Sequence, residues 1–265
     1  MLHFSLTMSN SRNAAAAASS ISTPLTTRSI VLSLLLGSHP PVMPVSALVE
    51  FCGLFDVAPG TVRTALSRMV DRGELTTDDG RYALSGRLLT RQREQDSGRR
   101  RAPAEWEGEW YVVIVTAERR TTTERRDFRA RAIGSRLGEL RPDIWMRPAN
   151  IEIPHDLPDC LITRGPLEGT GDETIARQLW DLPRIDSESH LRRADLDRAA
   201  EQLEQDGPDG LAAAFDALAL ALRLLRVEPQ LPAALHPTTA GDTLRARYDD
   251  VERRFRHELQ SFLHR

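Results

Sequence analysis

Hydrophobic positions recur with the spacing of amphipathic helices from residue 28 onward. The run RSIVLSLLLGS is apolar on nearly all sides, and after the prolines of PPVMP a helical face continues through Val45, Leu48, Val49 and Cys52. From Thr61 the apolar positions 62, 65, 66, 69 and 70 follow i, i+3, i+4, i+7, i+8 spacing. The pattern predicts three short helices, of which the third buries a single stripe.

The polar arc of the third predicted helix is short and mostly cationic. At about 100° per residue, the arc opposite the apolar stripe collects Arg63, Thr64, Ser67, Arg68 and Asp71. Arg72 lies at the edge of this arc, and Gly73 is expected to end the helix.

Directly after this helix, the segment ELTTDDGRYALS alternates around Asp79 and Gly80. An Asp-Gly dipeptide favours a two-residue turn with positive φ, so the segment predicts a β-hairpin. Three helices followed by a hairpin predict a winged helix-turn-helix over residues 28–98.

This order of elements has a use in DNA recognition, because a helix fits the major groove while a hairpin tip reaches the neighbouring backbone or minor groove. We expect base-edge contacts from Arg63, Thr64, Ser67 and Arg68, phosphate contacts from Thr61 and Arg72, and a wing contact from Arg81. Two alternatives stay open. Any amphipathic helix turns its charges outward, and winged helices also mediate protein contacts.

Composition fits an ordinary folded protein whose basic contacts are all made by arginine, and its net charge does not by itself indicate a nucleic-acid partner. The 265 residues include 35 basic and 38 acidic side chains, a net charge of −3, and every basic one is arginine, whose planar fork suits phosphates and base edges. Cys52 and Cys160 are too few for a disulfide framework or a cysteine-built zinc site, which indicates the cytoplasm. No apolar stretch reaches the roughly 20 residues that span a bilayer, so no membrane partner is expected.

Two segments have the composition of unstructured connectors. Residues 1–27 form a Ser, Thr and Ala tract without hydrophobic periodicity, which predicts a disordered leader in which Met8 is a second candidate start. After the hairpin, GRLLTRQREQDSGRRRAPAEW ends in a triple arginine and Pro103. We interpret it as a linker with a domain boundary near residues 98–105, although the arginines could also reach DNA phosphates.

Strands and helices alternate in the central segment, residues 105–188. EWYVVIVTA predicts a strand, the residues 121–141 a helix, DIWMRPANIEI a second strand and PDCLITRGPL a third. GDETIARQLWDLPRI predicts a helix that begins at Asp172. This order suggests a small α+β sandwich of the ferredoxin-like kind, which makes the whole chain an α+β protein.

Three helical segments fill residues 189–265 and are expected to form one helical domain. The last of them carries a continuous apolar seam at steps of four and three residues, formed by Leu244, Tyr248, Val251, Phe255, Leu259 and Phe262. We expect this seam to pack within the chain, with a seam between subunits as the alternative.

Motifs along the chain match one family in order. VRTALSRMVDRGEL resembles the recognition-helix signature of the PaaX-like regulators, the phenylacetic acid degradation repressors, and WEGEWYVVIV, DIWMRP and LWDL resemble landmarks of that family's central domain. FDALALALRLLRVEPQLPAALHP is similar to its closing segment. Glu228 stands where that family usually has aspartate, and no tryptophan follows the final proline motif.

The resemblance implies a dimeric transcriptional repressor that binds palindromic operators at catabolic promoters. It also implies release from DNA by an acyl-coenzyme A effector, phenylacetyl-coenzyme A in the best-known case, with no cofactor. A homodimer also follows from symmetric half-sites, which need two recognition helices related by a twofold axis.

Three residues are candidates for effector binding. Trp145 could stack an aromatic acyl group, although large aromatic residues in strands are more often core, and Arg147 and Arg164 could pair with coenzyme A phosphate.

An enzyme is the competing class. A metal-dependent nuclease would use acidic residues of the central fold such as Asp143 or Asp159. Nucleases that resemble this domain usually place an acidic residue at the end of the first strand, but position 117 there is alanine. The histidines lack the i, i+4 pairing of a metal-binding helix, and Ser67 has no neighbouring histidine and aspartate. We therefore expect no catalytic activity and no metal site.

Overall fold

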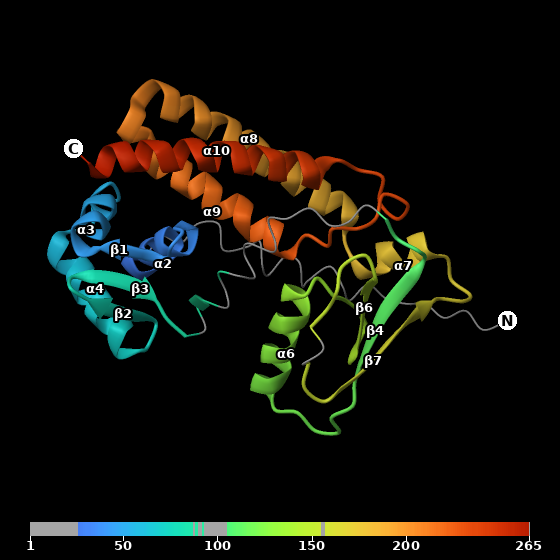
Figure 1. Ribbon diagram of the computed structural model, residues 1–265. Helices are drawn as coiled ribbons and strands as arrows, with labels where there is room; N and C mark the ends of the chain where they lie inside the picture. The colour runs from blue at the N-terminus through green and yellow to red at the C-terminus, as the bar shows by residue number, and fades with distance from the viewer. Residues whose placement is uncertain (1–25, 87, 90–91, 93–104, 155–156, 265) are drawn as a thin grey trace.

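The computed structural model describes residues 26–86, 88–89, 92, 105–154 and 157–264. It confirms a mixed α+β chain with two antiparallel sheets, of strand orders β1-β3-β2 and β5-β6-β4-β7 (Figure 1). Most of the predicted leader and of the predicted linker, including the triple arginine, lies outside the described residues. The start of the linker prediction is wrong where the structure describes it, because Leu88 and Leu89 are helical and pack against the core, and Gln92 is buried and donates to the Leu36 and Ser38 carbonyls.

The N-terminal unit consists of three helices and a three-stranded sheet. Its elements are α2 (Thr27–Gly37), β1 (Val42–Pro44), α3 (Val45–Gly53), α4 (Pro59–Asp71), β2 (Leu75–Asp78) and β3 (Arg81–Leu84). The hairpin turn has φ 44° at Asp79 and 69° at Gly80, as the dipeptide predicts. β1 was not predicted, because three residues that follow two prolines and end in a third carry no periodic signal. It pairs with β3.

The central unit is a four-stranded antiparallel sheet with a helix on each face. Its elements are β4 (Glu109–Val115), α6 (Thr122–Gly134), β5 (Gly138–Arg141), β6 (Ile144–Pro148), β7 (Cys160–Pro166) and α7 (Asp172–Leu179). The helix predicted over residues 121–141 ends at Gly134 because Arg136 adopts φ 57°, and its last four residues form β5 instead. α6 packs on one face of the sheet, while α7 and residues 231–235 cover the other.

Three long helices complete the chain: α8 (Leu182–Asp206), α9 (Leu211–Val227), which follows the short 3-10 helix η1 (Gly207–Gly210), and α10 (Ala240–Leu263). The helix predicted over residues 171–185 is in fact the whole of α7 and the start of α8. The chain is extended at Trp180, and the Asp181 side chain caps α8 by accepting a hydrogen bond from the Arg184 N–H. The expected boundary at residue 188 therefore lies inside α8.

The N-terminal unit and the three C-terminal helices share one hydrophobic core, whereas the central sheet has its own. The ring of Phe51 on α3 lies 5.2 Å from that of Phe215 and 6.1 Å from that of Phe255. The apolar seam of α10 is part of this core, so it packs within the chain, as expected. In Figure 1 the N-terminal unit and the central sheet lie toward opposite ends of the helix bundle.

Candidate nucleic-acid interface

Helix α4 is anchored by one fully buried stripe. Val62, Leu66 and Met69 are each 0% exposed, and the helix packs against α2 and α3. Pro59 stands in the first turn, where its missing N–H leaves no hydrogen bond unmade. Because this stripe takes up one side of the helix, the opposite side is held at the surface in a defined orientation.

Every residue that the sequence places on the polar arc is exposed. This holds for the base-edge candidates and the phosphate candidates alike: Thr61, Arg63, Thr64, Ser67, Arg68 and Arg72. Within the part of the chain that the structure describes, neither guanidinium of Arg63 and Arg68 makes a hydrogen bond or ion pair. Their donors are therefore available to a ligand.

Two other side chains of the arc are partly committed. The Thr64 hydroxyl donates to the Gly60 carbonyl at 2.9 Å, which leaves its oxygen lone pairs as acceptors. Arg72 donates from Nε to the Arg68 carbonyl at 3.0 Å, and its terminal nitrogens make no hydrogen bond with a described residue. Thr64 is thus set to accept and Arg72 to donate.

The turn between α4 and the hairpin is tied to the start of α2. Arg28 binds Glu74 through two nitrogens, at 2.6 Å from Nη2 and 3.0 Å from Nε. The hydrogen bond from Arg28 is the main reason why the pKa of the Glu74 carboxyl is lowered, and the charge of Arg72 adds to the effect. This pair neutralises the carboxylate at the base of the hairpin.

Acidic side chains moderate the field of this surface. Asp71, Asp78 and Asp79 are exposed beside the arginines of α4 and the hairpin. Arg81, the predicted wing contact, is exposed and also lines a cavity between this unit and the C-terminal helices. Any affinity for phosphates must therefore come from placed side chains rather than from a broad positive potential.

The three candidate effector residues share the face of the central sheet that α6 covers, but two of them are buried. Trp145 is 4% exposed, and its ring lies 6.0 Å from that of Phe128. Arg147 is 1% exposed and donates to the carbonyls of Pro148 at 3.0 Å and Ser135 at 3.3 Å. Burial and the neighbouring charge of Arg136 lower the pKa of Arg147 to about 9. No ligand can reach Arg147 from solvent without displacing these contacts.

Arg164 is the most accessible of the three, because β7 forms an edge of the sheet. Its side chain is 44% exposed, donates to Glu109 at 2.6 Å and lies 5.7 Å above the ring of Tyr111. The bond to Glu109 raises the pKa of Arg164. The structure brings Arg147, Tyr111 and Arg164 into one row across the sheet, with Trp145 in the next row.

A buried polar junction that the sequence did not reveal joins the central sheet to the helix bundle. Arg136 donates to the carbonyls of Leu225 at 3.2 Å and Glu228 at 2.9 Å, at the carboxyl end of α9, where a helix dipole favours a cation. Burial lowers the pKa of Arg136. The only sequence signal here was the position of Glu228 in its proline motif.

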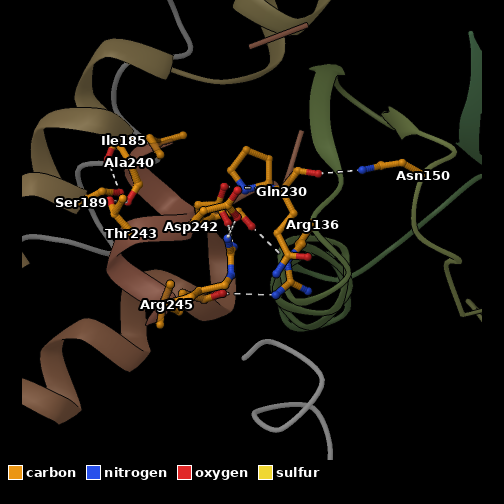
Figure 2. Close-up of polar contacts among 12 residues, drawn as sticks. Arg136, Asn150, Ile185, Ser189, Gln230, Ala240, Asp242, Thr243 and Arg245 are labelled. Carbon is orange, nitrogen blue, oxygen red and sulfur yellow. Dashed lines mark hydrogen bonds and ion pairs between the residues drawn. The ribbon is translucent and has the colours of Figure 1, made fainter. Parts of the chain in front are cut away.

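Glu228 is the acidic centre of this junction. It binds Arg245 on α10 and accepts a hydrogen bond from the Gln230 N–H at 3.0 Å. The Gln230 carbonyl in turn accepts from Asn150 at 2.8 Å, at the end of β6. Figure 2 shows Asn150 and Arg136 reaching from the sheet side toward Gln230, with Arg245 and Asp242 on the helix side.

The acidic candidates for a nuclease lie on either side of the end of β4, where the Val115 N–H donates to the Asp143 carbonyl at 2.9 Å and the Thr116 N–H to the Asp159 carbonyl at 2.8 Å. Asp143 and Asp159 occupy turns with positive φ, and Asp143 pairs with Arg120. Among the residues that the structure describes, no three His, Cys, Asp or Glu side chains gather in the manner of a metal site. In the same residues, no helix combines the length and apolarity needed to cross a membrane.

Comparison with known proteins relates the N-terminal unit to a family and the whole chain to one solved structure. Its residues 26–88, the segment containing α2 to β3, match the family model described as PaaX-like protein. The solved structure of the uncharacterized protein Rv0674 from Mycobacterium tuberculosis is 34% identical, with a TM-score of 0.68 over 90% of this chain and 99% of that one. No curated protein matches. The N-terminal unit therefore matches the PaaX-like family, the same family that the motifs along the chain resemble.

Proposed function

We propose that this protein is a DNA-binding transcriptional regulator in which α2, α3, α4 and the β2-β3 hairpin form a winged helix-turn-helix. In this reading α4 is the recognition helix and the hairpin is the wing. β1 adds a third strand to the hairpin, which is compatible with that architecture.

One observation carries the proposal: Arg63 and Arg68 flank the exposed face of a helix whose other face is fully buried, and neither guanidinium makes a hydrogen bond or ion pair with a described residue. The 13 residues of α4 span about 20 Å at 1.5 Å per residue. A helix of this length lies in the major groove, where arginine pairs bidentately with guanine.

In this proposal the central unit has a regulatory rather than a catalytic role. β4, α6 and β5 form a split βαβ unit with β6 between the two strands, and the order β5-β6-β4-β7 is that of ferredoxin-like sheets. It departs from that pattern because α7 follows β7 instead of preceding it. We assign this unit and the helix bundle to dimerisation and signal transmission, without catalysis and in the cytoplasm.

The proposed regulator acts as a homodimeric repressor of aromatic-acid catabolic genes, released by an acyl-coenzyme A effector such as phenylacetyl-coenzyme A. The match of its N-terminal unit to the PaaX-like family supports this assignment. Trp145 and Arg147 would take part only indirectly, through the packing of the sheet against the bundle, because both are buried.

The experiment measures binding of the full chain to its own upstream promoter DNA by fluorescence anisotropy, at several salt concentrations. Arg63→Ala should weaken specific binding by about 1–3 kcal/mol and relax the base preference at one position. Arg72→Ala should weaken all sequences alike and reduce the salt slope by about one. Arg253→Ala, an exposed change on α10 far along the chain from this surface, is the matched control.

Three results would contradict the proposal. Equal effects of Arg63→Ala and Arg72→Ala on specific and random DNA would refute the assignment of α4 to base reading. Metal-dependent cleavage of the DNA would favour a nuclease, and no preference for the promoter over random DNA would favour a protein-assembly module.

A further inference from the structure

A cavity of about 430 Å³ lies between the N-terminal unit and the C-terminal helices. One wall comes from α2 and the segment that leads into β1, and the opposite wall comes from α9 and α10. The volume falls in the range of about 300–1,000 Å³ that is typical of small-molecule sites. Since the two walls are remote in sequence, a ligand here would contact both parts of the shared core at once.

The interior of this cavity is apolar. Leu32 and Leu36 on α2 face Phe215, Leu218 and Tyr248 on the bundle. All five side chains are 6% exposed or less, and they belong to the shared hydrophobic core. This part of the cavity therefore suits an apolar body such as an aromatic ring or an aliphatic chain.

The polar part of the lining has five arginines and one carboxylate, Glu252, as its charged side chains. Of the five arginines, Arg28 is paired with Glu74 and Arg256 with Glu252. The other three, Arg81, Arg223 and Arg226, make no hydrogen bond or ion pair with any described residue. Three guanidinium groups that make no ion pair around one apolar cavity can hold an anion, because arginine binds carboxylate and phosphate through parallel hydrogen bonds.

We propose that this cavity binds an organic anion with an apolar body, and that Arg81 couples the site to DNA. The apolar body lies against α2 and α9, and the anionic group is held by Arg81, Arg223 and Arg226. Arg81 opens β3 directly after the hairpin turn, so a guanidinium held in the cavity is withdrawn from the wing. Binding of the anion does not depend on the proposed function, whereas its effect on DNA does.

The first experiment measures binding to the full chain without DNA, by the fluorescence of 8-anilinonaphthalene-1-sulfonate, an apolar ring system with one anionic group. Saturation at one molecule per chain is expected. Phenylacetate, coenzyme A and phenylacetyl-coenzyme A are then tested as competitors, and neutral phenylacetamide should not compete. The competitors distinguish a free acid from a thioester as the source of the anion.

Two variants test the location. The double substitution Arg223→Gln and Arg226→Gln should weaken the probe about tenfold or more, as expected for lost hydrogen bonds between ions. Ala219→Phe should abolish binding, because position 219 lines the cavity and the ring fills it. Arg253→Gln and Ala213→Phe, both exposed and outside the cavity, are the matched controls. Binding that is equally strong in the Ala219→Phe and Ala213→Phe variants would overturn the site.

The second experiment adds the anion to the protein on promoter DNA. The wild type should lose affinity for DNA, while the Arg223→Gln, Arg226→Gln double variant should bind DNA as tightly as the wild type and ignore the anion. Probe binding without any change in DNA affinity would overturn the coupling through Arg81. Absence of DNA binding in the wild type would instead count against the proposed function and leave the probe titration standing.

Discussion

Removing the charge of Glu228 should destabilise the protein more than any other single loss of a carboxylate at the junction. The Glu228 side chain is 11% exposed, and that of its partner Arg245 is 7% exposed. The Arg245 Nε atom is already buried without a hydrogen-bond partner, and its terminal nitrogens reach Glu228 and, at 3.3 Å, Asp242. In Glu228→Gln the guanidinium would keep only the weaker of these two partners.

The expected magnitude follows from the burial of this pair. Breaking a buried ion pair by removing one partner costs about 3–5 kcal/mol. Glutamine retains an acceptor for the Gln230 N–H, so the loss should fall near the lower end. In addition, Arg136 would lose the favourable charge that Glu228 supplies against its own burial. For a chain of this size, about 3 kcal/mol corresponds to a decrease in Tm of roughly 6–12 °C.

Thermal unfolding followed by circular dichroism, at equal protein concentration, measures this effect. The matched control is Glu204→Gln, which removes a carboxylate that is 64% exposed and pairs with Arg254 on the surface. Surface pairs contribute about 0–1 kcal/mol, so the Tm of this control should change little. A decrease in Tm that is the same for both variants would refute the reasoning that burial makes the Glu228 pair matter.

Three further predictions concern single positions. Gly138→Ala should destabilise the sheet by about 1–3 kcal/mol, because the added Cβ would stand 2.7 Å from a side-chain carbon of α7. Gly134→Ala is the control, since its Cβ would meet nothing within 4 Å, and thermal unfolding of the two variants tests the difference. Burial raises the pKa of Cys52 to about 11, so this thiol should resist a disulfide reagent at pH 8 until denaturant is added, and rapid labelling of both thiols in the native protein would contradict it. The hydrogen bond from Arg28 lowers the pKa of Glu74, so the pair stabilises the fold above the unfolded pKa of about 4.3 and this contribution disappears as pH falls through the lower folded value. Glu74→Gln should therefore reduce Tm at pH 7 but not in strong acid, and an equal difference at both pH values would argue against the pair.

The candidate interface was the most predictable part of the molecule. The apolar spacing around Leu66 identified α4 and its exposed arc, and the Asp79-Gly80 dipeptide identified the hairpin, because both signals depend on neighbours within a few residues. Local patterns did not predict whether the guanidinium of Arg63 is paired with another residue. Only the absence of a described partner in three dimensions shows that its donors are available.

The central unit shows where local reasoning fails. The helical pattern after residue 121 continues past Gly134, but Leu137 is buried beneath the sheet and Gly138 packs against α7, so the chain turns into β5. In the same way, the extended residue at Trp180 separates α7 from α8 although the sequence is compatible with one helix. Contacts with segments far along the chain outweigh helix propensity at both places.

The sequence alone determined the family resemblance, the α+β composition, the helical periodicity and the surface of α4, since these depend on residue types and on short spacings. The tertiary structure decided the rest. Arg147, a plausible ligand contact beside a tryptophan, is buried because Asn150 and the carbonyls of Ser135 and Pro229 surround its guanidinium. The cavity with Arg81, Arg223 and Arg226 exists only because α2 and α9 pack on one core. Such long-range contacts decide which of many similar arginines form ion pairs, and local sequence patterns do not reveal them.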